Sequence, residues 1–112
     1  MPMDEDQRHH AAEQLVDNAD LGRFELYRDE ALAAWLYYTH LKPNRYALRH
    51  TEVDTAYRGQ GMAGAMVARV LEEIRSRAGT VTAICPFVVD FLAKTPTYAD
   101  LIDPRHPGSA FH

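Results

Sequence analysis

Hydrophobic and polar residues alternate in the first half of the chain, and this pattern predicts three β-strands. Residues 22–27 place Phe24 and Leu26 on one face and charged residues on the other, as in a half-buried strand. Residues 31–39 are apolar on both faces, and their aromatic cluster favours a strand, although their alanines would also suit a helix. Residues 45–53 follow a Lys-Pro-Asn break and are predicted to be the third strand.

A three- and four-residue repeat of apolar positions then predicts an amphipathic helix. Its apolar positions are Met62, Met66, Val67, Val70, Leu71 and Ile74. We expect Gly79 to close this helix as a C′ residue with a left-handed backbone. Residues 80–85 predict a strand that Pro86 ends, followed by helical turns over residues 87–92. Thr95 is expected to cap a last short helix that runs to Ile102, with a proline at its first position.

This order of elements predicts one domain of the α+β class. The chain has 112 residues, which is long enough for one hydrophobic core without metals or disulfides. Residues 1–14 are polar and are expected to form a flexible N-terminal arm or a frayed helix. Residues 15–104 are expected to form the folded domain, and residues 105–112 a loose C-terminal tail.

Composition and charge narrow the range of functions that the sequence allows. The 12 basic and 16 acidic side chains leave a net charge of −4, which argues against a broad basic surface for nucleic acid. One cysteine excludes an internal disulfide and suits a reducing compartment. The N-terminus holds no apolar run, so we expect neither a signal peptide nor a membrane segment, and a cytoplasmic protein. His9 and His10 are adjacent but lack a third ligand, so no metal site is predicted.

A glycine-rich turn between the third strand and the helix predicts a phosphate-binding site. The first N–H groups of a helix have no internal partner and point toward the turn, where the helix dipole adds positive charge. Gly59 and Gly61 remove side chains that would keep a phosphate away, and Arg58 adds a cation. The spacing matches neither a Walker loop nor a dinucleotide fingerprint. The alternative is a plain tight turn in which the glycines are structural.

Three motifs together resemble a known family. They are His50-Thr51-Glu52-Val53, Arg58-Gly59-Gln60-Gly61-Met62-Ala63 and Cys85-Pro86-Phe87-Val88. The second matches the signature Arg/Gln-x-x-Gly-x-Gly/Ala of the GNAT acetyltransferases, and the set resembles the short single-domain GNAT-related family. The similarity runs from about Gly22 to Leu101. It implies a truncated GNAT-like core: a mixed, mostly antiparallel sheet with a coenzyme-binding helix, a further parallel strand and short C-terminal helices.

The resemblance also implies coenzyme A or acetyl-CoA as the co-substrate. The backbone from Gly59 to Ala63, which includes Gln60 and Met62, would hold the pyrophosphate, with Arg58 beside it. The pantetheine arm would run along the strand that ends at Val53, toward Cys85. The chain departs from the family pattern at three places: Asp54-Thr55 and Ala83 stand where proline is frequent, and Thr95 stands where histidine is common.

Three residues are candidates for chemistry. Cys85 could be a thiol nucleophile that the resemblance places at the acetyl thioester, or a small buried core residue. His50 could be the base, but simple alternation puts it on one face with Tyr46 and Leu48, as a core histidine; a β-bulge would reverse that assignment. Tyr98 could return a proton to the leaving thiolate, or simply pack.

Two functions therefore follow from the sequence. The first is acetyl transfer from acetyl-CoA to an unidentified small amine or protein amine, either through Cys85 or by direct attack with backbone N–H groups polarising the thioester. The second is an acyl-CoA-binding module that acts through a protein partner. The domain lacks the early helices that shape the acceptor pocket of larger GNAT enzymes, so its acceptor site is expected to be open, completed by a partner, or absent.

Overall fold

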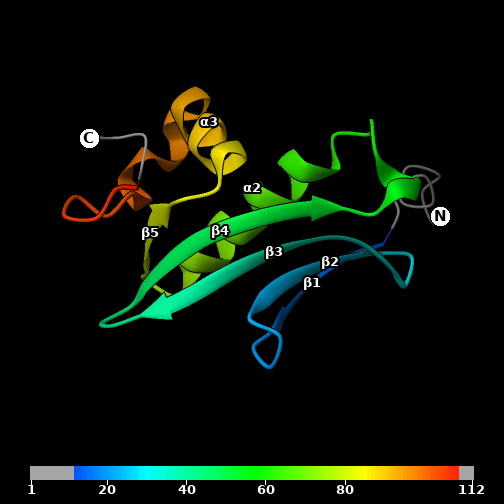
Figure 1. Ribbon diagram of the computed structural model, residues 1–112, viewed down its shortest axis with the longest axis horizontal. Helices are drawn as coiled ribbons and strands as arrows, with labels where there is room; N and C mark the ends of the chain where they lie inside the picture. The colour runs from blue at the N-terminus through cyan, green and yellow to red at the C-terminus, as the bar shows by residue number, and fades with distance from the viewer. Residues whose placement is uncertain (1–11, 109–112) are drawn as a thin grey trace, which may run out of the picture.

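The computed structural model describes residues 12–108, which form a five-stranded mixed sheet with helices on one face (Figure 1). The sheet order is the chain order, β1-β2-β3-β4-β5. The first four strands are antiparallel, and β5 is parallel to β4. The strands are β1 (Glu13–Asn18), β2 (Arg23–Arg28), β3 (Ala31–Leu41), β4 (Arg45–Val53) and β5 (Thr80–Ala83). The helices are η1 (Thr55–Tyr57), α2 (Met62–Ser76), α3 (Pro86–Lys94) and η2 (Pro96–Leu101), of which η1 and η2 are 3₁₀ helices.

The structure confirms the α+β class and the predicted strands and helices, with small shifts at their ends. It adds β1, which the sequence did not predict. Leu15 and Val16 are neighbours, so this segment shows no alternation, and its pairing with β2 organises it as a strand. Glu13 and Gln14 belong to β1, which corrects the predicted arm at residues 1–14. The rest of that arm, residues 1–11, lies outside the described residues.

The core lies between the sheet and α2. Helix α2 crosses β3 and β4, and all six of its predicted apolar positions are buried. They pack on Phe24, Leu26, Leu36 and Leu48 from three neighbouring strands, whose side chains point to the same face because alternate residues share one face of a sheet. Helix α3 adds Val88 to the same core. This packing fixes the start of α2 beside the end of β4.

The end of α2 differs from the prediction. Ala78, with φ of 57°, takes the left-handed conformation that Gly79 was expected to take. Gly79 instead allows close packing, since a Cβ there would stand 3.0 Å from the Asn44 carbonyl oxygen and 3.0 Å from the Tyr46 ring, which is tighter than an ordinary contact. The glycine therefore lets β5 start directly against the β3–β4 turn.

The beginning of the predicted loose tail is held on the sheet. Ala83 N–H donates to the Pro107 carbonyl over 3.0 Å, and Gly108 forms a parallel bridge with Ala83. The Thr82 hydroxyl donates to the His106 carbonyl. Residues 106–108 therefore cover the free edge of β5, which corrects the expectation for this part of the tail. Residues 109–112 lie outside the described part.

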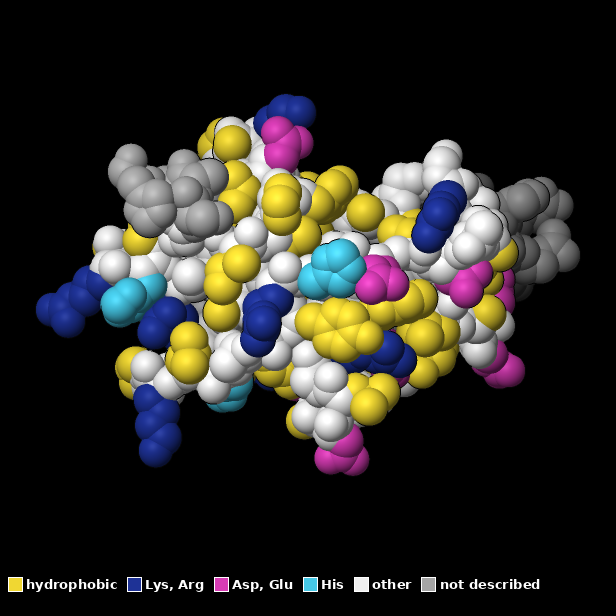
Figure 2. Space-filling view, viewed as in Figure 1, with side chains coloured by type: hydrophobic (Ala, Val, Ile, Leu, Met, Phe, Trp, Pro, Cys, Tyr) yellow, Lys and Arg dark blue, Asp and Glu magenta, His cyan; other side chains and the backbone are white. Residues whose placement is uncertain are grey.

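The opposite face of the sheet, here called the outer face, carries no helix within residues 12–108 (Figure 1). Half-buried aromatic and charged side chains cover it. The space-filling view shows hydrophobic side chains gathered at its middle, beside a histidine and an acidic side chain (Figure 2). No helix in the described part of the chain is long and apolar enough to cross a membrane.

Candidate functional site

The two parallel strands separate before β4 ends, and within residues 12–108 this leaves part of β4 without a neighbour on that side. The register of β4 with β5 stops at the pair Leu48–Ala83. The N–H groups of Ile84 and Cys85 both donate to the Leu48 carbonyl, over 3.0 and 2.9 Å, and the chain then turns into α3. Strand β4 continues to Val53. Residues 49–53 thus offer a free strand edge that opens beside Cys85, and such an edge exposes backbone donors and acceptors.

The glycine turn follows directly from the end of β4. The Asp54 side chain accepts from Ala56 N–H and caps η1, which turns the chain toward α2. Gly59 and Gly61 have φ of 77° and 73°, in the left-handed region that side chains other than hydrogen disfavour. A Cβ at either position would meet no heavy atom of the described residues within 4 Å. The glycines are therefore required by backbone conformation, and the space beside them is open.

The start of α2 presents backbone donors to this turn. The first helical bond runs from Ala65 N–H to the Gly61 carbonyl, at 3.1 Å. The amides of Met62, Ala63 and Gly64 precede it, so the helix gives them no internal partner. Gly61, the N-cap residue, has no side chain that could satisfy them. The positive end of the helix dipole lies at the same place, which makes this terminus suited to an anion.

A pocket of about 200 Å³ lies on this turn. Six of the seven predicted coenzyme residues line it: Val53, Arg58, Gly59, Gly61, Met62 and Ala63. Gln60, the seventh, does not line it, and its side-chain amide donates to the Ala56 carbonyl over 3.3 Å. Tyr57, Gly64 and Phe87 complete the lining. These three residues were not predicted from the sequence. The one signal for Phe87 was its place in the Cys85-Pro86-Phe87 motif, and the structure leaves its side chain 41% exposed at the pocket.

Arg58 links the turn to the strand. Its Nε donates to the Val53 carbonyl over 3.3 Å, which leaves the rest of the exposed guanidinium near the pocket. A guanidinium keeps its charge at all physiological pH values and offers several donors to phosphate oxygens. The pocket is smaller than those that enclose a whole drug-sized ligand. It therefore suits a charged group at one end of a longer ligand.

Cys85 is buried at the point where β4 and β5 separate. It is the N-cap residue of α3, it is 4% exposed, and its Sγ lies 3.6 Å from the Thr51 hydroxyl oxygen. Thr51 belongs to the free part of β4. The thiol therefore stands beside the open strand edge and next to the helix-start residue Pro86.

A β-bulge in β4 decides the position of His50. Tyr38 pairs with Leu48 and Tyr37 pairs with His50, so Arg49 is an extra residue without a partner on β3. An extra residue of this kind shifts the alternation by one. His50 therefore lies exposed on the outer face and not in the core with Tyr46 and Leu48, and the assignment from simple alternation is wrong.

On the outer face, His50 is oriented by a carboxylate. His50 Nε2 lies 2.9 Å from Glu52 Oε2, and the His50 ring stacks toward Tyr37 with 6.4 Å between ring centroids. A carboxylate accepts hydrogen bonds, so Nε2 carries the proton and Nδ1 of the neutral ring is left to accept one. This role of Glu52 was not predicted from the sequence.

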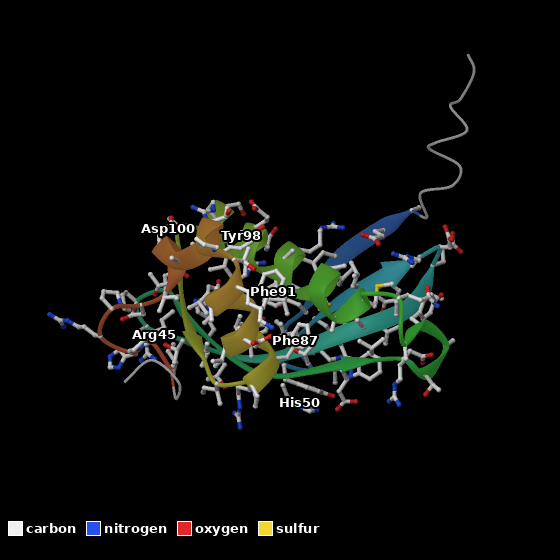
Figure 3. The ribbon with its side chains drawn as sticks, turned by 90° about the horizontal axis from the view of Figure 1, so that it is seen from above. Arg45, His50, Phe87, Phe91, Tyr98 and Asp100 are labelled. Atoms are coloured by element: carbon white, nitrogen blue, oxygen red, sulfur yellow. The ribbon has the colours of Figure 1, made fainter. Side chains whose placement is uncertain are left out.

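Tyr98 does not lie at the glycine turn. Its hydroxyl donates to the Glu72 carboxylate over 2.8 Å, and the Arg75 guanidinium lies 5.8 Å from its ring centroid. Glu72 is ten residues after Met62, or about 15 Å along the axis of α2. In Figure 3 the labelled side chains run from Tyr98 through Phe91 and Phe87 to His50, with Tyr98 and His50 at opposite ends of the row.

The strand, the glycine turn and the helix that follows define a class of proteins, and comparisons with known proteins identify it. Residues 23–101 match the family model of the GCN5-related N-acetyl-transferases. This match covers most of the chain, so the protein belongs to the GCN5-related N-acetyltransferase family. No curated protein matches it by sequence.

Solved structures share the fold. A GCN5-like protein from Staphylococcus aureus is 22% identical, with a TM-score of 0.60 over 92% of this chain and 98% of that one. A ribosomal-protein-alanine N-acetyltransferase from Brucella melitensis is 18% identical, with a TM-score of 0.50 over 67% of this chain and 58% of that one. Against two other similar proteins, from Desulfovibrio desulfuricans and Escherichia coli, the chain spans 44% and 50% of their length.

Proposed function

We propose that this protein transfers an acetyl group from acetyl-CoA to an amine. The observation that carries this proposal is the pocket at the glycine turn, where Arg58, two left-handed glycines and the unpaired amides of α2 converge at the end of β4. These groups suit a pyrophosphate, because backbone donors and a guanidinium there can hold phosphate oxygens without a side chain in the way. Membership of the acetyltransferase family supports the same ligand.

The free edge of β4 gives the rest of the coenzyme a path. Asp54 N–H donates to the Ala33 carbonyl of β3. Since backbone groups alternate sides along a strand, the N–H and C=O groups of Val53 and Thr51 face away from β3. A pantetheine arm has amides that could bond to these groups, as a further strand would. This path leads from the glycine turn at Val53 to Thr51, whose hydroxyl contacts Cys85.

Cys85 provides one route for the transfer. Its thiolate would attack the thioester carbonyl, the carbon–sulfur bond to coenzyme A would break, and the released thiolate would take up a proton. An acceptor amine would then displace the Cys85 sulfur from the acetyl group and release its own proton. In the second route the amine attacks the thioester directly, and Cys85 only packs beside it.

His50 suits the proton transfer of the direct route. Its Nδ1 is left to accept a proton, because Nε2 donates to Glu52. An amine that forms the new carbon–nitrogen bond must lose a proton, and the unprotonated nitrogen of a neutral imidazole can accept it. Since His50 is on the outer face, the acceptor would approach from that side, while the coenzyme lies on the free edge.

The coenzyme part of the proposal is tested by thermal unfolding. A ligand that binds the folded state alone raises its stability by about 2.7 kcal/mol at a hundredfold excess over Kd, so coenzyme A should raise the Tm. Arg58→Glu should weaken coenzyme A binding at least about tenfold, since it places a negative charge beside the phosphates. Arg105→Glu, the same charge change in the loop after η2, is the control and should keep the full shift. Equal shifts in wild type and Arg58→Glu would contradict the phosphate site.

The route through Cys85 is tested by mass spectrometry of the intact protein after exposure to acetyl-CoA. The covalent route predicts a chain carrying one acetyl group on Cys85 when no acceptor is present. Cys85→Ala should then abolish transfer to an amine while the Tm shift with coenzyme A remains. A Cys85→Ala variant with full transfer would assign the thiol a packing role and leave the direct route. Coenzyme binding without transfer to any acceptor would favour the binding-module function.

A further inference from the structure

The bulge in β4 places two functional groups next to each other on the outer face. The Arg49 guanidinium donates to the Thr39 hydroxyl over 3.2 Å, and Thr39, like Tyr37, points to the outer face because alternate β3 residues such as Tyr38 point to the core. His50, the next residue, also lies on this face beside Tyr37. A bulge allows this arrangement, whereas a regular strand would send two consecutive side chains to opposite faces.

A pocket of about 400 Å³ lies at this bulge. It is lined by Leu21, Gly22, Tyr37, Tyr38, Arg49 and His50, which come from the β1–β2 turn and from β3 and β4. It is separate from the pocket on the glycine turn, and it shares no residue with it. Leu21 is 55% exposed and lines the pocket together with Tyr37, so these two side chains give it an apolar wall.

Charge is arranged along this pocket. Arg49 supplies a cation whose exposed guanidinium has one bond, to Thr39, among the bonds found for the described residues. His50 also lines the pocket, and because its Nε2 is engaged by the Glu52 carboxylate, its Nδ1 is left to accept a hydrogen bond from a proton-donating group. The wall formed by Leu21 and Tyr37 suits an apolar side chain. A carboxylate, an amine and an apolar group thus each have a complementary place.

We infer that this pocket binds the acceptor, and that the acceptor is an apolar α-amino acid with a free carboxylate. The carboxylate lies on Arg49, the α-amino group faces His50, and the side chain lies between Leu21 and Tyr37. An α-amino acid carries its two charged groups on one carbon, which matches two consecutive residues that share a face. A guanidinium binds a carboxylate through two parallel hydrogen bonds, so this contact also orients the amine.

The position of the pocket is compatible with acetyl transfer to a bound amine. This inference rests on the proposed function, because the amine must meet a thioester. Among the described residues, β4 has no neighbour on its β5 side from Arg49 to Val53, so one strand separates the pocket from the free edge. Thr51, which follows His50, contacts Cys85 on the other face. An amine held at His50 is therefore one strand away from the edge along which the acetyl group would lie.

Binding is tested first without coenzyme, by NMR titration of the whole chain with three probes. They are L-leucine, L-leucinamide, which lacks the carboxylate, and 4-methylpentanoate, which lacks the amine. L-leucine should shift the amide signals of Gly22, Arg49 and His50. The other two probes should bind at least about tenfold more weakly, because each leaves one pocket group, Arg49 or His50, without its partner. Equal affinity for L-leucine and L-leucinamide, or shifts confined to other residues, would overturn the inference.

Variants then test the acceptor pocket independently of the coenzyme site. Arg49→Gln should lower the affinity for L-leucine to that for L-leucinamide, and Arg49→Lys should restore part of it. Arg45→Gln is the matched control, since Arg45 bonds to Thr82 outside the pocket and should keep the preference. All three variants should keep the Tm shift with coenzyme A. If the protein binds coenzyme A but not L-leucine, only the proposed acceptor pocket is overturned. If it binds L-leucine but not coenzyme A, the proposed coenzyme site is overturned.

Discussion

Tyr98 shows how the surroundings of one side chain decide its role. Burial and then the hydrogen bond to Glu72 raise the pKa of the Tyr98 hydroxyl above its ordinary value. A phenol with a raised pKa releases its proton less readily, which makes it a poorer acid toward a leaving thiolate. Arg75 lies over its ring and also binds Asp100 over 2.7 Å. These contacts tie η2 to α2, and they favour packing over the acid role considered from the sequence.

Tyr98→Phe should therefore leave catalysis intact. It removes one hydrogen bond, so we expect the free energy of unfolding to fall by about 0.5–1.5 kcal/mol. The kcat for acetyl transfer should stay within about twofold of wild type, since each tenfold loss would require about 1.4 kcal/mol of lost transition-state stabilisation. Denaturant unfolding and steady-state kinetics measure the two effects. A large loss of kcat with unchanged stability would restore Tyr98 as the acid.

Among the elements, β2 carries a buried carboxylate on the outer face. Glu25 is 3% exposed and accepts hydrogen bonds from Arg23 Nε at 2.7 Å, the Tyr27 hydroxyl at 2.9 Å and Asn18 Nδ2 at 3.1 Å. Burial alone would raise the pKa of the Glu25 carboxyl, but these bonds, with the Arg23 charge, outweigh it and hold the pKa below its ordinary value. The Arg23 guanidinium also covers the Trp35 ring at 5.4 Å. The network thus joins β1, β2 and β3 without a covering helix.

The depressed pKa makes stability depend on pH. The stabilisation from Glu25 is fully present above the ordinary glutamate pKa of about 4.3 and is lost as the pH falls through the lower folded-state pKa. We expect Glu25→Gln to lower the free energy of unfolding by about 1–3 kcal/mol at neutral pH. This difference from wild type should shrink below pH of about 4.3.

Urea unfolding at several pH values measures this effect. Glu30→Gln, an exposed glutamate in the β2–β3 turn, is the control and should follow the wild-type curve. If the difference in unfolding free energy between wild type and Glu25→Gln stayed constant down to the lowest pH measured, the lowered pKa of Glu25 would contribute nothing to stability.

The elements also differ in how far the sequence could predict them. Strand β4 and helix α2 follow patterns set by their own residues, so their bounds were predicted nearly correctly. Strand β1 depends on pairing with β2, and no local pattern marks it. The bulge at Arg49 depends on the register with β3, so the face of His50 could be named only as an alternative. Tyr57 and Phe87 enter the turn pocket from segments that fold together, which the motif alone does not reveal.

For the molecule as a whole, the last described residues complete the sheet. Asp103 N–H donates to the Val81 carbonyl over 2.8 Å, and Gly108 bridges to Ala83. Gly108 has φ of 121°, and a Cβ on it would lie 1.9 Å from the Ala83 carbonyl oxygen. This residue therefore passes so close to β5 that its backbone position requires glycine. The C-terminal segment is part of the folded domain through residue 108.

Gly108→Ala should consequently destabilise the protein. The added methyl group cannot fit against the Ala83 backbone, so the segment must leave the edge of β5 or move the strand. We expect a loss of about 1–3 kcal/mol, as for other strained or overpacked positions. Gly64→Ala is the control, because its Cβ would meet Phe91 at an ordinary 3.9 Å and alanine favours a helix. Equal unfolding curves for wild type and Gly108→Ala would refute the close contact.

The agreement between sheet order and chain order has a consequence for folding. Strands β1, β2 and β3 each pair with the next strand through a short turn, so these contacts close small loops and cost little chain entropy. The pairing of β4 with β5 closes a longer loop, residues 54–79, which contains the whole glycine turn and α2. We expect the antiparallel strands to form first and the parallel pair last. The phosphate site would then be completed in the final step, so a ligand bound there would slow the first step of unfolding.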